Sequence, residues 1–370
     1  MSSSDAAAAR PRARDLGIPF DGETGPLNAI TDVAGVEVGT ITLVSGDGAL
    51  EIGKGPVRTG VTVIHPRGRV RPFDAVFAGR FSLNGNGEMT GTHWIDEVGA
   101  FEGPVAITNT HAIGMTHHGV IRWMIEHPNF DADKDHWMLP VVGETYDGWL
   151  NDINGLHVRV DDVLDACDEA SADLPAEGNV GGGTGMICYE FKGGTGTASR
   201  IAAVGDGGYT VGVLVQANFG KRDDFSVRGV PVGRHLTDNR VWTGGDGSII
   251  AVAATDAPLM PHQLNRVARR IGLGIGRTGT ASDHSSGDIF VAFSTGNDVS
   301  LGGGEEGTID HIADADMDPL FRATVDSTEE AILNAVVAAE TMTGRDGNTV
   351  HAINHPALRD VMRQYGRLEE

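Results

Sequence analysis

The stretch that decides the fold is Gly244-Gly245-Asp246-Gly247-Ser248-Ile249-Ile250-Ala251-Val252-Ala253-Ala254. A glycine-rich approach leads to one serine, and an unbroken apolar run follows, which predicts a buried strand over residues 249–254. Gly247 has no side chain to obstruct attack on its own carbonyl carbon, so Ser248 is a candidate nucleophile for the bond that precedes it. Local sequence alone is more typical of an ordinary turn before a strand, so both interpretations stand at this point.

Cleavage of the 247–248 bond would give Ser248 a free α-amine beside its hydroxyl. An α-amine titrates at about 7.7–8.0, so near pH 8 much of it is the free base. Such a base can take the proton of the neighbouring hydroxyl and activate it as a nucleophile.

Composition excludes several classes of protein. The chain has 370 residues and a formal charge of −23, which argues against binding a nucleic-acid backbone. No apolar run approaches the 18 residues of a membrane-spanning helix, and the first residues lack the apolar core of a secretory signal. Two cysteines, Cys167 and Cys188, form no disulfide framework. We expect a cytoplasmic protein that binds neither nucleic acid nor membrane.

Glycine is the compositional outlier, with 53 residues dispersed among short apolar segments. This pattern predicts many tight turns and close backbone approaches. Strands are expected at 33–44, 60–65, 76–79, 104–108, 202–204, 209–217, 249–254 and 288–293, and helices at 117–127, 160–167, 261–273, 328–342 and 356–365. Because strands and helices come in blocks, we predict an α+β fold, as one domain over residues 16–370.

Two further segments have compositions that predict how they fold. Residues 1–15 are rich in serine and alanine and predict a disordered arm. Residues 221–243 carry several arginines and few apolar side chains, which predicts an exposed segment leading to Ser248. The helix over 328–342 is expected from the capping box Ser327-Thr328-Glu329-Glu330.

Glycine and histidine clusters suggest two other functions that the context disfavours. Gly274-Ile275-Gly276-Arg277-Thr278-Gly279 matches a dinucleotide-binding fingerprint literally, yet it follows a predicted helix instead of a strand. His111, His117 and His118 lie close in sequence without the spacing of a zinc site. We therefore expect neither an organic cofactor nor a metal.

Polar residues at predicted strand ends, and two in the segment 142–148, are candidates to assist Ser248. Ser286 and Asp288 alternate onto one side of an extended chain, where a hydroxyl and a carboxylate could orient a base. Asn218 ends an apolar strand and could donate its amide to an oxyanion. Glu144 could hold a substrate ammonium, and Tyr146 could be a second oxyanion donor. Taken singly, each of these is also typical of a turn or a surface loop.

Together these segments resemble the self-processing L-aminopeptidase/D-esterase–amidase family, with the β-peptidyl aminopeptidases as close relatives. The resemblance extends over nearly the whole chain. Its blocks are Arg12-Ala13-Arg14-Asp15-Leu16-Gly17-Ile18, Asn28-Ala29-Ile30-Thr31-Asp32-Val33-Ala34-Gly35-Val36, Ser82-Leu83-Asn84-Gly85-Asn86-Gly87-Glu88-Met89-Thr90-Gly91, Thr108-Asn109-Thr110-His111, Gly178-Asn179-Val180-Gly181, Gln216-Ala217-Asn218-Phe219-Gly220, Gly245-Asp246-Gly247-Ser248 and Ser286-Gly287-Asp288-Ile289-Phe290.

The resemblance implies a four-layer αββα sandwich, similar to the N-terminal-nucleophile hydrolases but connected differently. It implies autocleavage between Gly247 and Ser248 into an α subunit, 1–247, and a β subunit, 248–370. One departure is visible, since Ser285 stands where a glycine commonly precedes the second serine. The roles that the resemblance assigns are Ser248 as nucleophile, Ser286 and Asp288 in support, Asn218 and Tyr146 at the oxyanion, and Glu144 at the substrate amine.

The function expected from this resemblance is an aminopeptidase, without cofactor or metal, that acts on short peptides, amino-acid amides and esters. Self-association of the αβ units into a tetramer of heterodimers is expected as well. Two alternatives remain: a related self-cleaving acyl- or acetyltransferase, for which the resemblance implies a threonine nucleophile, and a non-enzymatic glycine-loop ligand-binding protein.

Overall fold

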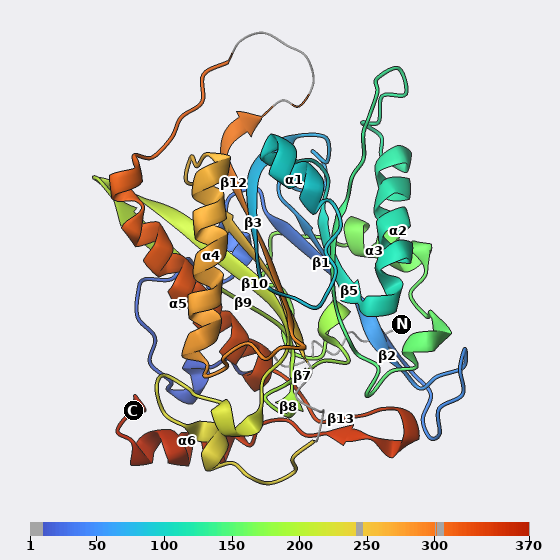
Figure 1. Ribbon diagram of the computed structural model, residues 1–370, viewed down its shortest axis with the longest axis vertical. Helices are drawn as coiled ribbons and strands as arrows, with labels where there is room; N and C mark the ends of the chain where they lie inside the picture. Colours follow the sequence, from blue (N-terminus) through green and yellow to red (C-terminus); the bar gives the residue numbers. More distant parts are fainter. Residues whose placement is uncertain (1–9, 242–246, 300, 302–306, 370) are drawn as a thin grey trace, which may run out of the picture.

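The computed structural model describes residues 10–241, 247–299, 301 and 307–369, and the statements below refer to these residues. Two sheets form the centre of the molecule (Figure 1). The four-stranded sheet has the order β1 (Glu37–Ser45), β2 (Val57–His65), β5 (Val105–Asn109), β6 (Val141–Thr145). The six-stranded sheet has the order β4 (Ala100–Phe101), β3 (Ala75–Gly85), β12 (Gly287–Val299), β11 (Ser248–Thr255), β10 (Gly207–Asn218), β9 (Gly194–Val204).

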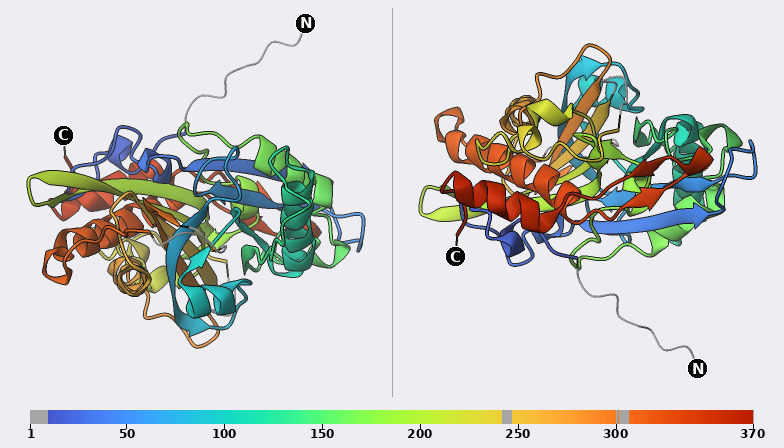
Figure 2. Two further views of the ribbon diagram at one scale, coloured as in Figure 1. Left: turned by 90° about the horizontal axis from the view of Figure 1, so that it is seen from above. Right: turned by 90° about the horizontal axis from the view of Figure 1, so that it is seen from below.

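Helices cover the outer face of each sheet. Helices α4 (Pro261–Arg277) and α5 (Asp318–Val337) pack on the six-stranded sheet, and α2 (Ile113–Glu126) and α3 (Val160–Asp168) on the four-stranded sheet. Figure 2 shows these two pairs on opposite sides of the molecule. The fold is therefore the expected four-layer αββα sandwich. The remaining helices are α1 (Thr92–Val98) and α6 (His355–Gln364), and two small hairpins are β7–β8 (Ile187–Cys188, Phe191–Lys192) and β13–β14 (Met342–Thr343, Thr349–Val350).

Strand β11 shows why the apolar run after Ser248 is continuous. Its neighbours are β10, which is antiparallel, and β12, which is parallel, so both of its faces are covered. Ile250 and Val252 face the other sheet, whereas Ile249 and Ala251 face the helices. All eight residues of β11 are buried, and a strand with two buried faces needs apolar side chains at every position.

The capping-box prediction for α5 is wrong. The helix begins at Asp318, with a proline in its first turn, and Ser327 and Thr328 lie in its middle. The Thr328 hydroxyl donates to the carbonyl of Thr324 at 2.7 Å, an intrahelical bond that leaves it unavailable as a cap. The helix is buried on nearly all sides from residue 320 to 337, so tertiary packing overrides the local capping signal.

Two segments predicted to be disordered or exposed are ordered where the structure describes them. Residues 10–15 enter a short 3-10 helix, Arg14–Leu16, and Arg14 pairs with the buried Glu330 of α5; the rest of the arm, residues 1–9, lies outside the described residues. In the segment after residue 221, Arg222 is fully buried over the Phe191 ring and donates to the backbone carbonyls of Tyr189 and Glu190. Paired arginines can be buried, so composition misjudged residues 10–15 and Arg222; many other residues of 221–241 are exposed as predicted, and residues 242–243 lie outside the described residues.

Candidate active site

Three strand ends of the six-stranded sheet meet at one edge. Ser248 begins β11, Asn218 ends β10, and Gly287 begins β12. In the strand register Ser248 lies opposite Asn218 on one side and opposite Gly287 on the other. The sheet topology thus joins segments that are 30 and 39 positions away from Ser248 along the chain.

The bond before Ser248 lies in a tightly packed position. The backbone N–H of Gly287 donates to the carbonyl oxygen of Gly247 at 3.1 Å. A Cβ atom at Gly247 would come within 2.7 Å of the Phe219 Cα and 2.8 Å of the Asn218 carbonyl oxygen. Only glycine fits here without a backbone shift, and this explains why a glycine precedes Ser248.

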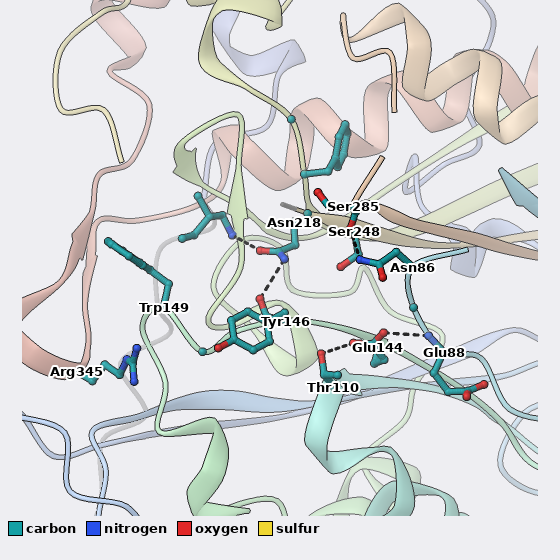
Figure 3. Close-up of a pocket in the computed structure, with 16 residues that line it drawn as sticks. Asn86, Glu88, Thr110, Glu144, Tyr146, Trp149, Asn218, Ser248, Ser285 and Arg345 are labelled. Carbon is teal, nitrogen blue, oxygen red and sulfur yellow. Dashed lines mark hydrogen bonds between the residues drawn. The ribbon is translucent and has the colours of Figure 1, made fainter. Parts of the chain in front are cut away.

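The Asn218 side chain is oriented at both ends of its amide. Its Oδ1 accepts from the Ile187 backbone N–H at 2.8 Å, and its Nδ2 donates to the Tyr146 carbonyl oxygen at 3.1 Å (Figure 3). An amide nitrogen has two hydrogens, and the second has no partner among the described residues. That hydrogen remains available to a substrate oxygen.

Glu144, in β6, forms an anionic site at the cavity wall. Its Oε1 accepts from the Glu88 backbone N–H at 3.0 Å, and its Oε2 accepts from the Thr110 hydroxyl. Burial raises the pKa of this carboxyl, while the two hydrogen bonds act in the opposite direction. A carboxylate with both oxygens fixed and one side open to the cavity is suited to bind an ammonium group.

Tyr146 is the most exposed of the predicted site residues, at 53%. Its ring lies against Gly148, where a Cβ atom would come within 2.3 Å of the phenol oxygen. Because Gly148 has no side chain, the Tyr146 ring can lie directly over the backbone of residue 148. The hydroxyl makes no hydrogen bond to any described residue, and Figure 3 shows the ring between Glu144 and Trp149.

Ser286 and Asp288 form a buried pair, as their alternation predicted. The Ser286 hydroxyl donates to Asp288 Oδ1 at 2.6 Å, and the Ser282 hydroxyl donates to Oδ2. Burial raises the pKa of the Asp288 carboxyl. Neither residue lines the cavity, whereas Ser285 does. Asp288 lies on the same face of β12 as Phe290, which faces the helices. Within the described residues the Ser248 hydroxyl makes no hydrogen bond to Ser286 or to Asp288.

The other five predicted residues, Glu144, Tyr146, Asn218, Gly247 and Ser248, line one cavity of about 680 Å³, within the usual range for small-molecule sites. The further residues of its wall are Asn86, Gly87, Glu88, Thr110, Gly148, Trp149, Ile187, Phe219, Gly220, Ser285 and Arg345. The wall combines segments from both sides of the 247–248 bond.

Two residues without an assigned role hold this site together. Gln216, buried in β10, donates Nε2 to the Thr108 carbonyl at 2.9 Å and to the Thr145 hydroxyl at 2.8 Å, which ties the two sheets beside Glu144. Lys192 is fully buried and donates to the carbonyls of Met186 at 2.7 Å and Gly193 at 2.9 Å, next to the Ile187 N–H that orients Asn218. Gln216 stands in the same sequence block as Asn218, but nothing in the sequence distinguishes Lys192 from a surface lysine.

The alternative sites remain without support in the part of the chain that the structure describes. Gly274 and Gly276 lie in the last turn of α4, where Gly274 allows close packing against Thr328 of α5, and not at a strand-to-helix turn. Across the described ranges, no three His, Cys, Asp or Glu side chains gather as ligands for a metal ion. No helix within these ranges has both the length and the apolar character needed to cross a membrane.

Comparison of the whole fold identifies the class. The structure superposes with a TM-score of 0.92 on the L-aminopeptidase D-Ala-esterase/amidase of Ochrobactrum anthropi, at 51% identity, covering 97% of this chain and all of the other. That enzyme is described as a prototype for the serine aminopeptidases and a variant of the Ntn-hydrolase fold. A Burkholderia sp. β-aminopeptidase superposes with a TM-score of 0.89 at 44% identity, over 96% and 99% of the two chains. The chain is therefore a serine aminopeptidase of the Ntn-hydrolase class.

Sequence comparison gives the family. The profile of peptidase family S58 matches residues 28–350, and the chain belongs to this family. The β-peptidyl aminopeptidase BapA of Sphingosinicella microcystinivorans is 50% identical over 380 aligned positions, covering 98% of this chain and 94% of the relative. The resemblance drawn from the sequence blocks is thus confirmed at the level of fold, family and aminopeptidase activity.

Proposed function

We propose that the chain matures by cutting its own Gly247–Ser248 bond and that the freed Ser248 is the nucleophile of an aminopeptidase. The observation that carries the proposal is the position of Ser248, which begins a buried central strand at the wall of a cavity and lies between Asn218 and Gly287. Fragments 1–247 and 248–370 would stay together because β11 is hydrogen-bonded to β10 of the first fragment.

In the maturation step the Ser248 hydroxyl oxygen attacks the Gly247 carbonyl carbon. The peptide C–N bond breaks, the nitrogen takes up a proton, and an ester links Gly247 to the serine oxygen. Water then hydrolyses this ester to leave a carboxylate on Gly247 and a free amine on Ser248. The Gly287 N–H, which is bonded to the Gly247 oxygen, supports this step because it stabilises negative charge on that oxygen.

In each catalytic cycle the Ser248 α-amine takes the hydroxyl proton and the oxygen attacks the substrate carbonyl. The oxyanion accepts hydrogen bonds from the free Asn218 N–H and from the Tyr146 hydroxyl. The leaving amine, or the alcohol of an ester, takes the proton from the α-ammonium. Water then hydrolyses the ester on Ser248 and releases the acyl group. Glu144 binds the substrate ammonium, which restricts the reaction to the amino end of short substrates.

Ser286 and Asp288 act as positioning residues in this proposal. Their hydrogen-bonded pair lies beside Gly287, the partner of Ser248 in the strand register. The pair holds the start of β12 against the start of β11, so that the polar groups around the new α-amine of Ser248 keep fixed positions.

The proposed substrates are short peptides, amino-acid amides and esters. The relatives' names point to L-, D-alanyl and β-amino-acid residues, so a panel of aminoacyl p-nitroanilides of these three kinds determines the preference. Assembly into a tetramer of two-fragment units and a cytoplasmic location stay predictions, and light scattering of the purified protein measures the first of them.

The maturation test is intact-mass analysis with denaturing electrophoresis. Wild-type protein is expected as two fragments that break between Gly247 and Ser248, and Ser248→Ala as one inactive chain. A matched control is Ser294→Ala, since Ser294 is a buried serine of β12 that lies opposite Thr255, at the other end of β11 from Ser248, and should not prevent cleavage. An active wild-type protein that stays in one piece contradicts the proposal.

A further inference from the structure

The cavity around Ser248 has opposite charges at its two ends. Glu144 and Glu88 provide carboxylates on one side, and Arg345 is the one cationic side chain among the described residues of the wall. In Figure 3 the Tyr146 ring and Asn218 lie between Glu144 and the pair formed by Trp149 and Arg345. The groups proposed to act on the substrate carbonyl therefore lie between an anionic and a cationic site.

A short hairpin positions Arg345. It lies between β13 and β14, and its backbone N–H donates to the Leu150 carbonyl at 2.9 Å. Asn348 Nδ2 donates to the Trp149 carbonyl at 3.0 Å, and Gly344 packs so closely that a Cβ atom would lie 2.0 Å from the Leu150 oxygen. These contacts fix the backbone of the arginine beside the cavity wall.

The side chain of Arg345 has unused hydrogen-bonding capacity. Within the described residues neither its Nε nor the Trp149 Nε1 has a hydrogen-bond partner, although both atoms are buried. The nearest carboxylate oxygen, Oδ2 of Asp346, is 4.0 Å from Nε, beyond hydrogen-bond distance. The other oxygen of Asp346 accepts from the Leu50 backbone N–H at 2.8 Å. The Arg345 side chain is 28% exposed, so the part of the guanidinium that a ligand can reach is its outer end and not the buried Nε.

We propose that Arg345 binds the terminal carboxylate of a short peptide whose amino group lies at Glu144. This inference rests on the proposed function. The planar guanidinium matches a carboxylate with two parallel hydrogen bonds, and neither terminal nitrogen of Arg345 donates to a described residue, so both can donate to a ligand in the cavity. With the amine and the carboxylate both bound, the site selects peptides short enough to reach from Glu144 to Arg345, and the C-terminal residue is the leaving group.

The test compares each free-acid dipeptide with its C-terminal amide, which differs by one charge. For the wild type we expect a higher kcat/KM on the acid, mainly through a lower KM. Arg345→Gln should lower the acid-to-amide ratio of kcat/KM by about 10- to 100-fold. Arg363→Gln, an exposed arginine in α6, serves as the matched control and should keep the wild-type ratio.

The outcomes separate this inference from the function it rests on. Equal kcat/KM values for acid and amide in the wild type, or an equal loss on both substrates in Arg345→Gln, overturn the role of Arg345 and leave the aminopeptidase proposal in place. Failure of the wild type to hydrolyse acid, amide and aminoacyl p-nitroanilide alike overturns both. The count of fragments and the melting temperature of Arg345→Gln show whether the variant is folded and matured.

Discussion

The Gly287 backbone N–H donates to the carbonyl oxygen of Gly247 at 3.1 Å, and this contact joins the start of β12 to the bond in front of β11. A peptide carbonyl that accepts such a bond is polarised, and its oxygen is held in one direction. The Ser248 hydroxyl belongs to the next residue, so the nucleophile and the polarised carbonyl are adjacent by covalent geometry. The remaining condition is that the backbone of residue 247 keeps this position.

Gly247→Ala tests that condition. A Cβ atom there would meet the backbone of Phe219 and Asn218 at 2.7–2.8 Å, so residue 247 must shift and the contact with Gly287 weakens. We expect fragment formation to slow at least about tenfold, followed as the ratio of precursor to fragments over time. The control is Gly276→Ala, an exposed helical glycine whose Cβ would contact nothing. Cleavage at the wild-type rate in Gly247→Ala would show that the close packing is irrelevant to the step.

Substitutions of Asn218 test the proposed oxyanion donor. Asn218→Asp keeps an oxygen for the Ile187 N–H but has no amide hydrogen, whereas Asn218→Ala lacks both. If the donor matters, both variants lose about 10²- to 10³-fold in kcat on an aminoacyl p-nitroanilide. If the side chain only orients the Ile187 loop, Asn218→Asp retains activity. Asn154→Asp, at an exposed position, controls for the added charge.

The pH profile tests Glu144. Burial raises its pKa, so its charged form is lost at a higher pH than for an ordinary glutamate. We expect the ratio of wild-type to Glu144→Gln kcat/KM to fall as the pH decreases through that pKa, because only the wild type has a charge to lose. Glu126→Gln is the matched control, since Glu126 is an exposed glutamate of α2 that does not line the cavity. A constant ratio between pH 4.5 and 8 would remove the ammonium-binding role.

The Ser286–Asp288 pair should affect both maturation and turnover. Ser286→Ala removes a 2.6 Å hydrogen bond to a buried carboxylate, and such bonds contribute roughly 1.5–3 kcal/mol. We expect fragment formation and kcat/KM each to fall about 10- to 100-fold, with kcat carrying most of the loss. The control is Ser285→Gly, one position earlier, because the Ser285 side chain takes no part in the bond between Ser286 and Asp288. Its rate of fragment formation and its kcat/KM should stay within about threefold of wild type. Equal effects of the two substitutions would contradict the positioning role.

Several residues of this site could be predicted from the sequence because they adjoin strands with a clear apolar pattern. Asn218 and Ser248 each adjoin a predicted strand with strong apolar patterning, so their places at strand ends follow from local sequence, whereas the strand that contains Glu144, β6, was not predicted. That the three strand ends share one cavity depends on sheet order, which local sequence does not encode; here the family resemblance supplied it.

Residues whose role depends on tertiary contacts were missed. Arg345 looks like an ordinary turn arginine until the β13–β14 hairpin places it at the cavity wall. Lys192 and Arg222 look like surface cations, yet backbone carbonyls surround both of them. These carbonyl oxygens come together around each cation only in the folded chain. Composition therefore predicts that Lys192 and Arg222 are exposed, whereas the structure shows that both are buried.

The buried Asp147, next to Tyr146, gives the fold itself a pH dependence. Burial raises the pKa of its carboxyl to about 7, from an ordinary value of 3.8. Between these values the unfolded chain has already released the proton that the folded chain still holds, so the unfolding free energy falls as the pH rises toward 7. Lys192, whose pKa burial lowers to about 7, contributes the opposite slope above that pH.

Asp147→Asn removes the first of these contributions and keeps the second. The amide can still accept at Oδ1 from Asn151 Nδ2, a 3.0 Å bond in the wild type. We expect the stability of Asp147→Asn relative to the wild type to increase by about 2 kcal/mol between pH 5 and pH 7 and then to level off. Urea unfolding in the Ser248→Ala background measures it on one continuous chain. Asp206→Asn, at an exposed turn, should show no such trend, and a flat difference for Asp147→Asn would mean that this carboxyl is charged throughout.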